Sequence, residues 1–402
     1  MSMASGFGPL VLPPKQAQEA RILRKSVLQH FQDLPDPRLD RTKHHPLMSV
    51  ITIALLGILS GADGFVGIEA YGKGKQSWLE TFIDLPNGIP SHDTFGRVFG
   101  ALCPEALEER FLSWITSITE NLQINLIHID GKTTRGSYDR EKKLKALHTV
   151  SAWSSEHGLV LAQQKVEGKT NEIKAVPLIL KLLNLNGAVI TLDAMGTQLD
   201  IVRQIKAGGG DYVIGLKGNQ GKLNQGIRDW FQAAETQGWR GISFSADETI
   251  HGGHHRIERR QVIAVAIDPL PPLHRQSQWI GLTTVIRIRS TRQLWNKTTQ
   301  EDRFYISSLL PEAARHNRVI RSHWSVENSL HWVLDVTFNE DSSRIRQGHA
   351  AQNLNLVRRL SVNLLKREPS KASLKMKRYK AGLDNDFLMK ILAASTHEVS
   401  AH

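Results

Sequence analysis

The stretch LIHIDGK, residues 126–132, decides the fold, because the character of the chain changes there. Upstream of it apolar residues recur at helical spacing, whereas this segment is a short apolar run that ends in a carboxylate, Asp130. A short apolar run of this kind predicts a buried β-strand. The later run VITLD ends in Asp193 in the same way and predicts a second buried strand.

Further strands and helices alternate around these two runs. The segments ALHTVSAWSS and LVLAQQKV predict a pair of hairpin strands. Helical segments, NEIKAVPLILKLLNLNG and TQLDIVRQIKAGGG, precede and follow VITLD, and DYVIGLKGNQ predicts a third buried strand. The order is therefore strand, two hairpin strands, helix, strand, helix, strand. This order predicts an α/β domain built on a mixed sheet, starting at residues 122–238.

The flanking regions have different patterns. Residues 21–121 predict a helical domain, and its most apolar run, 47–61, falls short of the roughly 20 residues that cross a bilayer. Residues 239–310 are rich in β-branched and aromatic side chains and predict a β-rich insertion. A helical pattern then resumes and returns to the α/β domain at 311–365. We expect a flexible leader at residues 1–20 and a basic tail at residues 366–402.

The charge balance is basic, with 51 Lys and Arg against 39 Asp and Glu, a net charge of +12. Such an excess favours a polyanionic partner, most often nucleic acid, although charge that serves solubility alone is the simpler alternative. A membrane surface is less favoured, because no basic amphipathic helix with a clean apolar face is apparent. A single cysteine, Cys103, fits a reducing cytosol, and no signal peptide is expected from the first residues.

The two strand-end aspartates are candidate metal ligands. A carboxylate at the carboxyl end of a buried strand points into the crevice where open α/β sheets bind ligands. Mg²⁺ and Mn²⁺ prefer carboxylate oxygens and water, so Asp130 and Asp193 on neighbouring strands predict a divalent metal site. The alternative for either residue alone is a turn or N-cap role. Asp211 is a poorer candidate, because it begins its strand and so lies at the opposite edge.

A third carboxylate lies far along the chain, in HWSVENSLHWVLD at residues 323–335. Here His323, Glu327, His331 and Asp335 recur at every fourth position, which predicts one polar stripe along a helix. The stripe either faces the crevice, with Glu327 as a third metal ligand, or is a solvated polar face. The spacing of His323, Glu327 and His331 differs from the HExxH zinc pattern. The histidine-rich HGGHH loop at residues 251–255 is only weak evidence for a zinc site.

Several long segments together carry a resemblance to a known family. They are HIDGKTTRGS, EGKTNEIKAVPLIL, ITLDAMGTQ, DYVIGLKGNQ, HGGHHRIERR and HWSVENSLHWVLDVTFNEDSSRIR. From about Ser26 to Leu365 the chain resembles bacterial insertion-sequence transposases of the DDE type, in the ISAs-type branch that includes the H-repeat-associated proteins of Rhs elements. The resemblance implies a ribonuclease-H-like catalytic domain in which Asp130, Asp193 and Glu327 bind the metal. It also implies a β-rich insertion and a helical N-terminal domain for DNA binding or assembly.

The sequence departs from the wider group around the catalytic glutamate. That group carries a Tyr, Arg, Glu, Lys pattern, whereas this chain has Ile320, His323 and Leu334 at the Tyr, Arg and Lys positions. We expect His323, Asn328 and His331 to contact the cleaved DNA end in their place.

The activity that the resemblance implies is DNA transposition with Mg²⁺, for which Mn²⁺ substitutes. Two ions clamp the attacking and leaving oxygens while water frees a 3′-OH at the element's end, and that 3′-OH then attacks target DNA. The implied partners are double-stranded DNA, as terminal inverted repeats and target, and a second copy of the chain, in the bacterial cytoplasm or on the nucleoid, with no membrane. The alternatives are a catalytically silent or domesticated DNA-binding homologue and a metal-dependent nuclease without strand transfer.

Basic residues near these motifs are candidate phosphate contacts, although each alone is as readily a solvated charge. They are Lys132, Arg135, Lys217, Arg256, Arg259, Arg260, Arg344 and Arg346. Trp324 and Trp332 are candidates for stacking on an extruded base, but tryptophans at helical spacing more often pack in the core. Strong phosphate contacts predict an affinity that falls steeply with salt.

Overall fold

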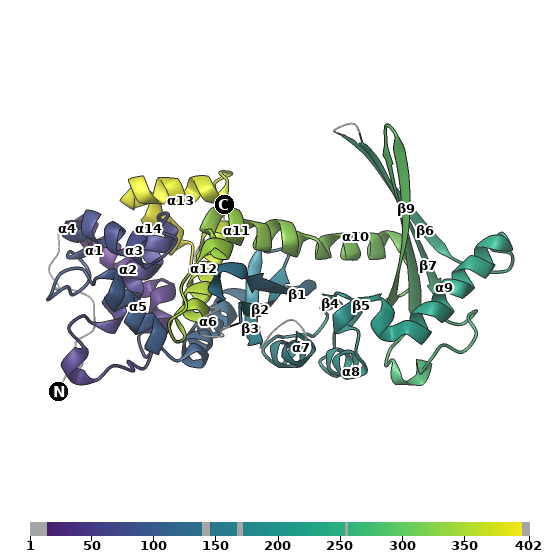
Figure 1. Cartoon of the computed structure of the whole chain (residues 1–402), viewed down its shortest axis with the longest axis horizontal. Helices are drawn as coiled ribbons and strands as arrows, with labels where there is room; N and C mark the ends of the chain where they lie inside the picture. The colour runs from purple at the N-terminus through teal and green to yellow at the C-terminus, as the bar shows by residue number, and fades with distance from the viewer. Residues whose placement is uncertain (1–13, 139–144, 167–171, 254–255, 396–402) are drawn as a thin grey trace.

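The computed structural model describes residues 14–138, 145–166, 172–253 and 256–395 of the chain. The molecule is elongated, with a helical body at one end, a sheet in the middle and a strand-built finger projecting at the other end (Figure 1). The first and last described helices, at residues 14–25 and 385–393, both belong to the helical body and contact each other, although nearly the whole chain separates them.

The strands form one nine-stranded sheet in the order β3-β2-β1-β4-β5-β9-β8-β7-β6. The first five strands are β1 (Leu126–Thr134), β2 (Leu147–Ser154), β3 (Leu159–Val166), β4 (Val189–Leu192) and β5 (Asp211–Leu216). β1 is antiparallel to β2 and parallel to β4, and β4 is parallel to β5. This is the mixed α/β sheet that the alternating pattern predicts, with α7 (Glu172–Lys181) before β4 and α8 (Leu199–Ala207) after it.

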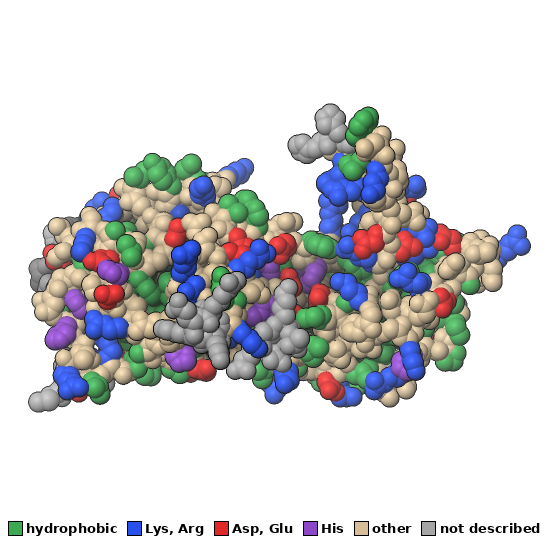
Figure 2. Space-filling model, viewed as in Figure 1, with side chains coloured by type: hydrophobic (Ala, Val, Ile, Leu, Met, Phe, Trp, Pro, Cys, Tyr) green, Lys and Arg blue, Asp and Glu red, His purple; other side chains and the backbone are tan. Residues whose placement is uncertain are grey.

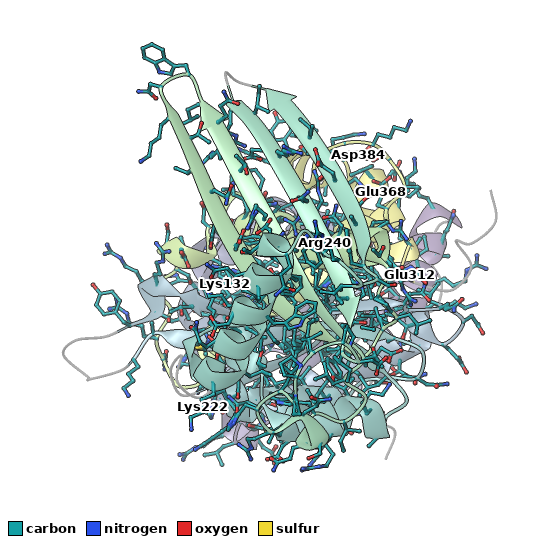
Figure 3. The ribbon with its side chains drawn as sticks, turned by 90° about the vertical axis from the view of Figure 1, so that its right-hand side faces the viewer. Lys132, Lys222, Arg240, Glu312, Glu368 and Asp384 are labelled. Carbon is teal, nitrogen blue, oxygen red and sulfur yellow. The ribbon has the colours of Figure 1, made fainter. Side chains whose placement is uncertain are left out.

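The predicted insertion is β-rich but extends the same sheet. Its strands are β6 (Ser245–Gly253), β7 (Arg256–Ala266), β8 (Thr284–Leu294) and β9 (Lys297–Ser307). β9 lies antiparallel to β5, with Val213 opposite Ser307 and Leu216 opposite Phe304. The halves of β7, β8 and β9 that lie nearest β5 are largely buried, whereas no residue of the edge strand β6 is fully buried. The outer halves of the strands project beyond α9 (Gly221–Thr236) as the finger (Figure 3).

Helices cover both faces of the sheet. α7 packs on β2 and β3 and α8 packs on β5, whereas α10 (Ala313–His323) contacts β4, β5, β6 and β7. A π-helical turn (Glu327–His331) and α11 (Trp332–Phe338) continue the direction of α10 toward the helical body (Figure 1). The helix that carries the predicted polar stripe thus runs along the sheet between finger and body.

The helical body consists of the segments before β1 and after α11. The helices are α1 (Pro14–Lys25), α2 (Leu47–Leu59), α3 (Phe65–Gly74), α4 (Gln76–Leu79), α5 (His92–Ala101), α6 (Pro104–Thr119), α12 (Ala350–Arg367), α13 (Leu374–Leu383) and α14 (Asn385–Ala393). α2 is a core helix as predicted, because every residue in it except Met48 is buried. No helix in the described part of the chain has the length and apolar character that crossing a bilayer requires.

The predictions for the two ends of the chain need correction. The expected leader overlaps α1, in which Glu19 and Ala20 are buried, and residues 1–13 lie outside the described part. The expected basic tail folds as α13 and α14 up to Ala393. Its charges are used internally, because Lys377 and Arg378 are buried and donate hydrogen bonds to backbone carbonyl groups such as those of Leu365 and Ala62.

Candidate active site

Asp130 and Asp193 lie side by side at one edge of the sheet. In the parallel pairing of β1 with β4, Ile129 is opposite Leu192, and each aspartate is the next residue along its strand. The prediction that Asp130 ends its strand is wrong, because β1 continues to Thr134 through its antiparallel pairing with β2. Asp130 therefore lies level with the end of β4. Its own strand, β1, continues beyond that point because it pairs with β2 along its other edge.

The glycine after Asp130 is required by close packing. A Cβ atom at Gly131 would lie 2.7 Å from Oε1 of Glu172 and 2.8 Å from Nε2 of His148. Both side chains are partners in one hydrogen bond, so neither is free to move away. The sequence DGK thus allows α7 and β2 to approach the strand directly beside the carboxylate.

The three predicted carboxylates line one cavity of about 780 Å³. Asp130 reaches it from β1, Asp193 from the end of β4 and Glu327 from the π-helical turn, and His323 and Lys217 also contribute to the wall. Asp193 and Glu327 are exposed to solvent, whereas Asp130 is partly covered. Residues from three distant parts of the chain therefore meet around one space.

The π-helical turn brings a histidine to the same place. Nδ1 of His331 lies 3.1 Å from Oε2 of Glu327 and 3.8 Å from Oδ2 of Asp130. One ligand atom from each of the three residues lies within 4.8 Å of the others, so together they could hold a metal ion. The hydrogen bond to His331 is the main cause of the lowered pKa of Glu327. His331 is buried, so the expectation that it contacts DNA does not fit its position.

The carboxylates have oxygen atoms available for a cation. Burial raises the pKa of Asp130, against the opposing effect of His331 and His323, and its one hydrogen bond among the described residues is from its neighbour Gly131. Asp193 accepts hydrogen bonds from backbone N–H groups at Oδ1, whereas its Oδ2 has no hydrogen-bond partner in the described part of the chain. A partly buried, weakly compensated carboxylate beside a second free oxygen fits a divalent cation.

A buried chain of polar side chains behind the cavity was not identified from the sequence. Nδ1 atoms of His128 and His323 lie 2.6 and 2.7 Å from the hydroxyl of Thr191, and Nε2 of His128 lies 2.8 Å from the hydroxyl of Ser155. Burial lowers the pKa of His128 to about 3, so its ring is neutral. The alternation of the strand run LIHID, which places His128 on the same face as Asp130, was the available signal.

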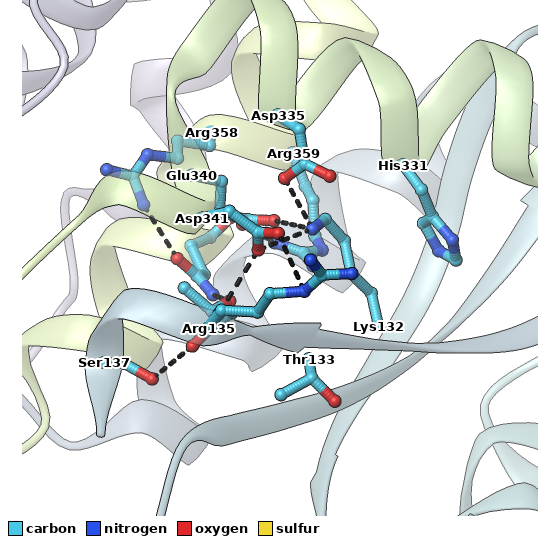
Figure 4. A network of polar contacts seen from close by, with 12 residues as sticks. Lys132, Thr133, Arg135, Ser137, His331, Asp335, Glu340, Asp341, Arg358 and Arg359 are labelled. Carbon is cyan, nitrogen blue, oxygen red and sulfur yellow. Dashed lines mark hydrogen bonds and ion pairs between the residues drawn. The ribbon is translucent and has the colours of Figure 1, made fainter.

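The assignment of Lys132 as a phosphate contact is wrong. Its side chain is buried, and its Nζ lies 2.6 Å from Asp335, 3.1 Å from Asp341 and 3.7 Å from Glu340 (Figure 4). Lys132 lies on the same face of β1 as Asp130, and there α11 and the loop after it place their carboxylates against its side chain, so it points into this acidic cluster instead of toward solvent. Asp335, the last member of the predicted polar stripe, is thereby drawn away from the cavity.

An arginine-rich groove adjoins the carboxylate cavity, and the two share Glu301, Arg303 and Trp324 in their walls. Among the described residues, six arginines and two glutamates line it. These arginines are Arg256, Arg259, Arg260, Arg292, Arg303 and Arg321. Figure 2 shows Lys and Arg side chains clustered on the projecting finger above a hollow of the surface.

Arg260 carries a partly buried charge in this groove that no carboxylate among the described residues compensates. It has no carboxylate partner among the described residues, and burial together with the nearby Arg321 and Arg303 lowers its pKa. By contrast, Arg259 forms a bidentate pair with Glu248, and Arg256 lies 3.0 Å from Glu258. The groove therefore has a net positive centre that favours an anion.

Trp324 and Asn328 lie in this groove and are exposed, with Arg303 over the ring of Trp324 at 5.5 Å. Core packing, the more common role for tryptophans at this spacing, does not apply, since Trp324 is 48% and Trp332 57% exposed. Two residues of the HGGHH loop, 254 and 255, lie outside the described part, and His251 contacts Arg321.

The remaining basic candidates are dispersed. Lys217 is exposed at the carboxyl end of β5, beside the carboxylates, and Arg135 is exposed near Asp341. Arg344 and Arg346 lie in a separate groove between the helical body and the loop after α11, where Arg346 lies over the ring of Tyr138. The structure thus places Lys217 in the wall of the carboxylate cavity and Arg256, Arg259 and Arg260 in the adjoining groove, whereas Arg344 and Arg346 lie apart from both.

Comparisons with known proteins give consistent results. The family profile described as "Transposase DDE domain" matches residues 121–364, and the profile described as "DDE_Tnp_1-associated" matches residues 28–115. "Putative transposase YncI" of Escherichia coli O157:H7 is 38% identical over 374 residues, which cover 92% of this chain and 95% of that protein. The "H repeat-associated putative transposase YhhI" of Escherichia coli K12 is 36% identical over 376 residues, covering 92% and 98%.

Among solved structures, a piggyBac transposase synaptic complex with hairpin DNA aligns with 95% of this chain and 83% of that chain. The sequence identity is 10% and the TM-score is 0.39.

Proposed function

This chain belongs to the transposase DDE-domain family, and from that premise we propose that it cleaves DNA at transposon ends and joins those ends to target DNA. The observation that carries the proposal is that Asp130, Asp193 and Glu327 line one cavity although about two hundred positions separate the first from the last. We further propose that the sheet β3-β2-β1-β4-β5 is a ribonuclease-H-like core formed by residues 122–238 and 311–365.

The three carboxylates would hold Mg²⁺, or Mn²⁺ in its place. Divalent ions bound there supply charge stabilisation to the attacking and leaving oxygens of a displacement at a DNA phosphate. Asp130 and Asp193 set the position of the site, because both are fixed by adjacent strands of one sheet. Glu327 is more exposed and would complete the site from the helix side.

Side chains around the carboxylates would hold the DNA in position for cleavage. The arginine-rich groove would bind phosphates on the way to the cavity, and Lys217 would contact a phosphate at its rim. His323 faces the cavity while Thr191 and His128 hold its ring from behind, so it would orient the cleaved end without carrying charge. Trp324 and Asn328, exposed at the junction of groove and cavity, would contact the bases next to that end.

The test of the function is incubation of the protein with Mg²⁺, duplexes carrying the element's terminal repeats and a target plasmid. We expect both cleaved ends and joined products, and neither when the Mg²⁺ is chelated. Cleaved ends without joined products would indicate a nuclease. Binding without either product would indicate a catalytically silent DNA-binding homologue.

The arginine-rich groove yields a second expected result. Replacing Arg260 or Arg321 with glutamine removes one positive charge that would bind a phosphate. Each variant should therefore bind duplex DNA with lower affinity, and the loss should be the same whatever the DNA sequence. The slope of log affinity against log salt should fall in magnitude by about 1 for each phosphate that the variant no longer binds. The measurement is fluorescence anisotropy with a labelled duplex at several salt concentrations.

Arg203→Gln is the matched control, because Arg203 is exposed on α8, is paired with Asp200 and lies outside both cavity walls. Its salt slope should equal that of the wild type. Equal slopes for all three variants would remove the groove from the proposed DNA path.

The remaining parts of the proposal rest on the family. The helical region at residues 21–121 would bind DNA or support assembly, and the finger within residues 239–310 would extend the DNA contact surface. Paired ends imply a homodimer on double-stranded terminal repeats, acting in the bacterial cytoplasm at the nucleoid. Sedimentation of the protein with and without two end duplexes tests the dimer.

A further inference from the structure

The ring of His331 is buried, and its polar contact is directed at the two carboxylates. It is 4% exposed, and Figure 4 shows it projecting from the helix toward strand β1. Nδ1 makes the ring's one hydrogen bond in the described part of the chain, to Glu327, whereas Nε2 is buried with no partner there. The polar interactions of this buried ring are therefore concentrated at Nδ1, the atom that faces Asp130 and Glu327.

The spacing of the donor atoms suits a single ion. Ligands held at about 2.1 Å in an octahedral shell lie about 3 Å apart when adjacent and about 4.2 Å apart when opposite. The separation of Nδ1 from Oε2 of Glu327 is 3.1 Å, and that from Oδ2 of Asp130 is 3.8 Å. Small rotations of the two carboxylates are therefore sufficient to place all three atoms around one ion.

The backbone provides independent support, because Glu327 and His331 are the first and last residues of the π-helical turn. Such wide turns are rare and occur frequently at functional sites. A π turn holds more residues than an α turn, so it changes the phase of the helix between Glu327 and Asp335. Both donors face Asp130 as a result, while Asp335 turns to Lys132.

Building on the proposed metal-dependent function, we propose that His331 is a nitrogen ligand of the ion shared by Asp130 and Glu327. This ion then has two carboxylate ligands, from Asp130 and Glu327, and one imidazole ligand, instead of the all-oxygen set that Mg²⁺ prefers. Imidazole is a good ligand for first-row transition ions. The ratio of Mn²⁺ affinity to Mg²⁺ affinity should therefore depend on His331.

The competing role for His331 is to position Glu327 through a hydrogen bond alone. In that case the ring stays outside the metal shell, and only Glu327 responds to its loss. The two roles can be distinguished by the magnetic coupling between bound Mn²⁺ and the nitrogen of His331. A nitrogen that ligates the ion shows this coupling, whereas a nitrogen outside the metal shell does not.

The test uses the full-length protein with Mn²⁺ alone in a buffer without nitrogen ligands. Binding is followed by electron paramagnetic resonance, and nitrogen coupling by electron spin-echo envelope modulation. We expect ¹⁴N modulation in the wild type and its loss in His331→Asn, in which an amide oxygen can occupy the place of Nδ1. Mn²⁺ affinity should fall by about 10-fold or more, since even outer-shell partners of ligands cost that much, and Mg²⁺ affinity by less.

His323→Asn is the matched control, because His323 lines the same cavity but its Nδ1 is engaged by Thr191. It should keep the ¹⁴N modulation. Mn²⁺ binding that needs Asp130 but shows no nitrogen coupling, or coupling that persists in His331→Asn, would overturn the inference and leave the proposed function standing. Mn²⁺ binding that is absent, or unchanged in Asp130→Asn, would overturn both.

Discussion

Changing Asp130 to asparagine should slow cleavage of transposon ends by at least about 10³-fold, the upper range for losing one charge-stabilising group in an active site. Asparagine retains an oxygen for the hydrogen bond from Gly131 and nearly the same volume, so the strand should not change. What is lost is the negative charge that would hold the cation. The measurement is the rate of single-strand nicking of a labelled end duplex with Mg²⁺.

The control is Asp200→Asn, because Asp200 is exposed on α8 and paired with Arg203. This variant should nick at the wild-type rate. The Asp130→Asn protein should keep its affinity for the duplex and its melting temperature. If it nicks DNA as fast as the wild type does, Asp130 has no part in the chemistry and the proposed enzyme is wrong.

The strands that position the site follow from local sequence patterns. LIHID and VITLD are apolar runs that each end in a carboxylate. When two such runs are parallel neighbours in a sheet, their carboxylates lie side by side at the same edge. Glu327 is different, because no local pattern links a helix near residue 327 to a strand near residue 130. Only the family resemblance placed it with the aspartates, and the cavity lining agrees with that placement.

The features that were missed depend on non-local contacts. Helical periodicity assumes 3.6 residues per turn, so it predicted one stripe from His323 to Asp335 and could not include a π turn. A lysine next to a candidate metal ligand suggests a phosphate contact until the fold surrounds it with carboxylates, as it does Lys132. Similarly, basic composition suggested a tail where Lys377 and Arg378 instead bind carbonyl groups of the body.

The polar cluster around Lys132 leads to the second large expected effect, on stability. Glu340 and Arg359 are both fully buried, and their charged atoms lie 2.8 Å apart. Burial would raise the pKa of Glu340, but Arg359, Arg358 and Lys132 together hold it below its ordinary value, so the carboxylate is ionised at neutral pH. The pair joins the loop after α11 to α12, the helix that leads into the helical body (Figure 4).

Changing Arg359 to methionine should lower the free energy of unfolding by about 3–5 kcal/mol, because it leaves a buried charge without its main partner. With an unfolding entropy of about 2.1 cal/mol/K per residue, this corresponds to a fall in melting temperature of about 5 °C. Circular dichroism during heating, together with the urea midpoint, measures both. Arg203→Met, in an exposed pair, should change the melting temperature by less than about 1 °C.

The double variant Arg359→Met with Glu340→Gln separates the cost of an unpaired charge from the value of the pair. If the single variant is unstable because Glu340 remains charged, neutralising Glu340 should restore much of the lost stability. A double variant as unstable as the sum of its parts would mean that packing, not charge, accounts for the loss. Lys132 and Asp130 lie two residues apart on β1, so nicking is measured for the same variants. A loss of nicking in Arg359→Met that the double variant recovers would connect this cluster to the geometry of the carboxylates. Nicking that stays at the wild-type rate in both variants would separate the two.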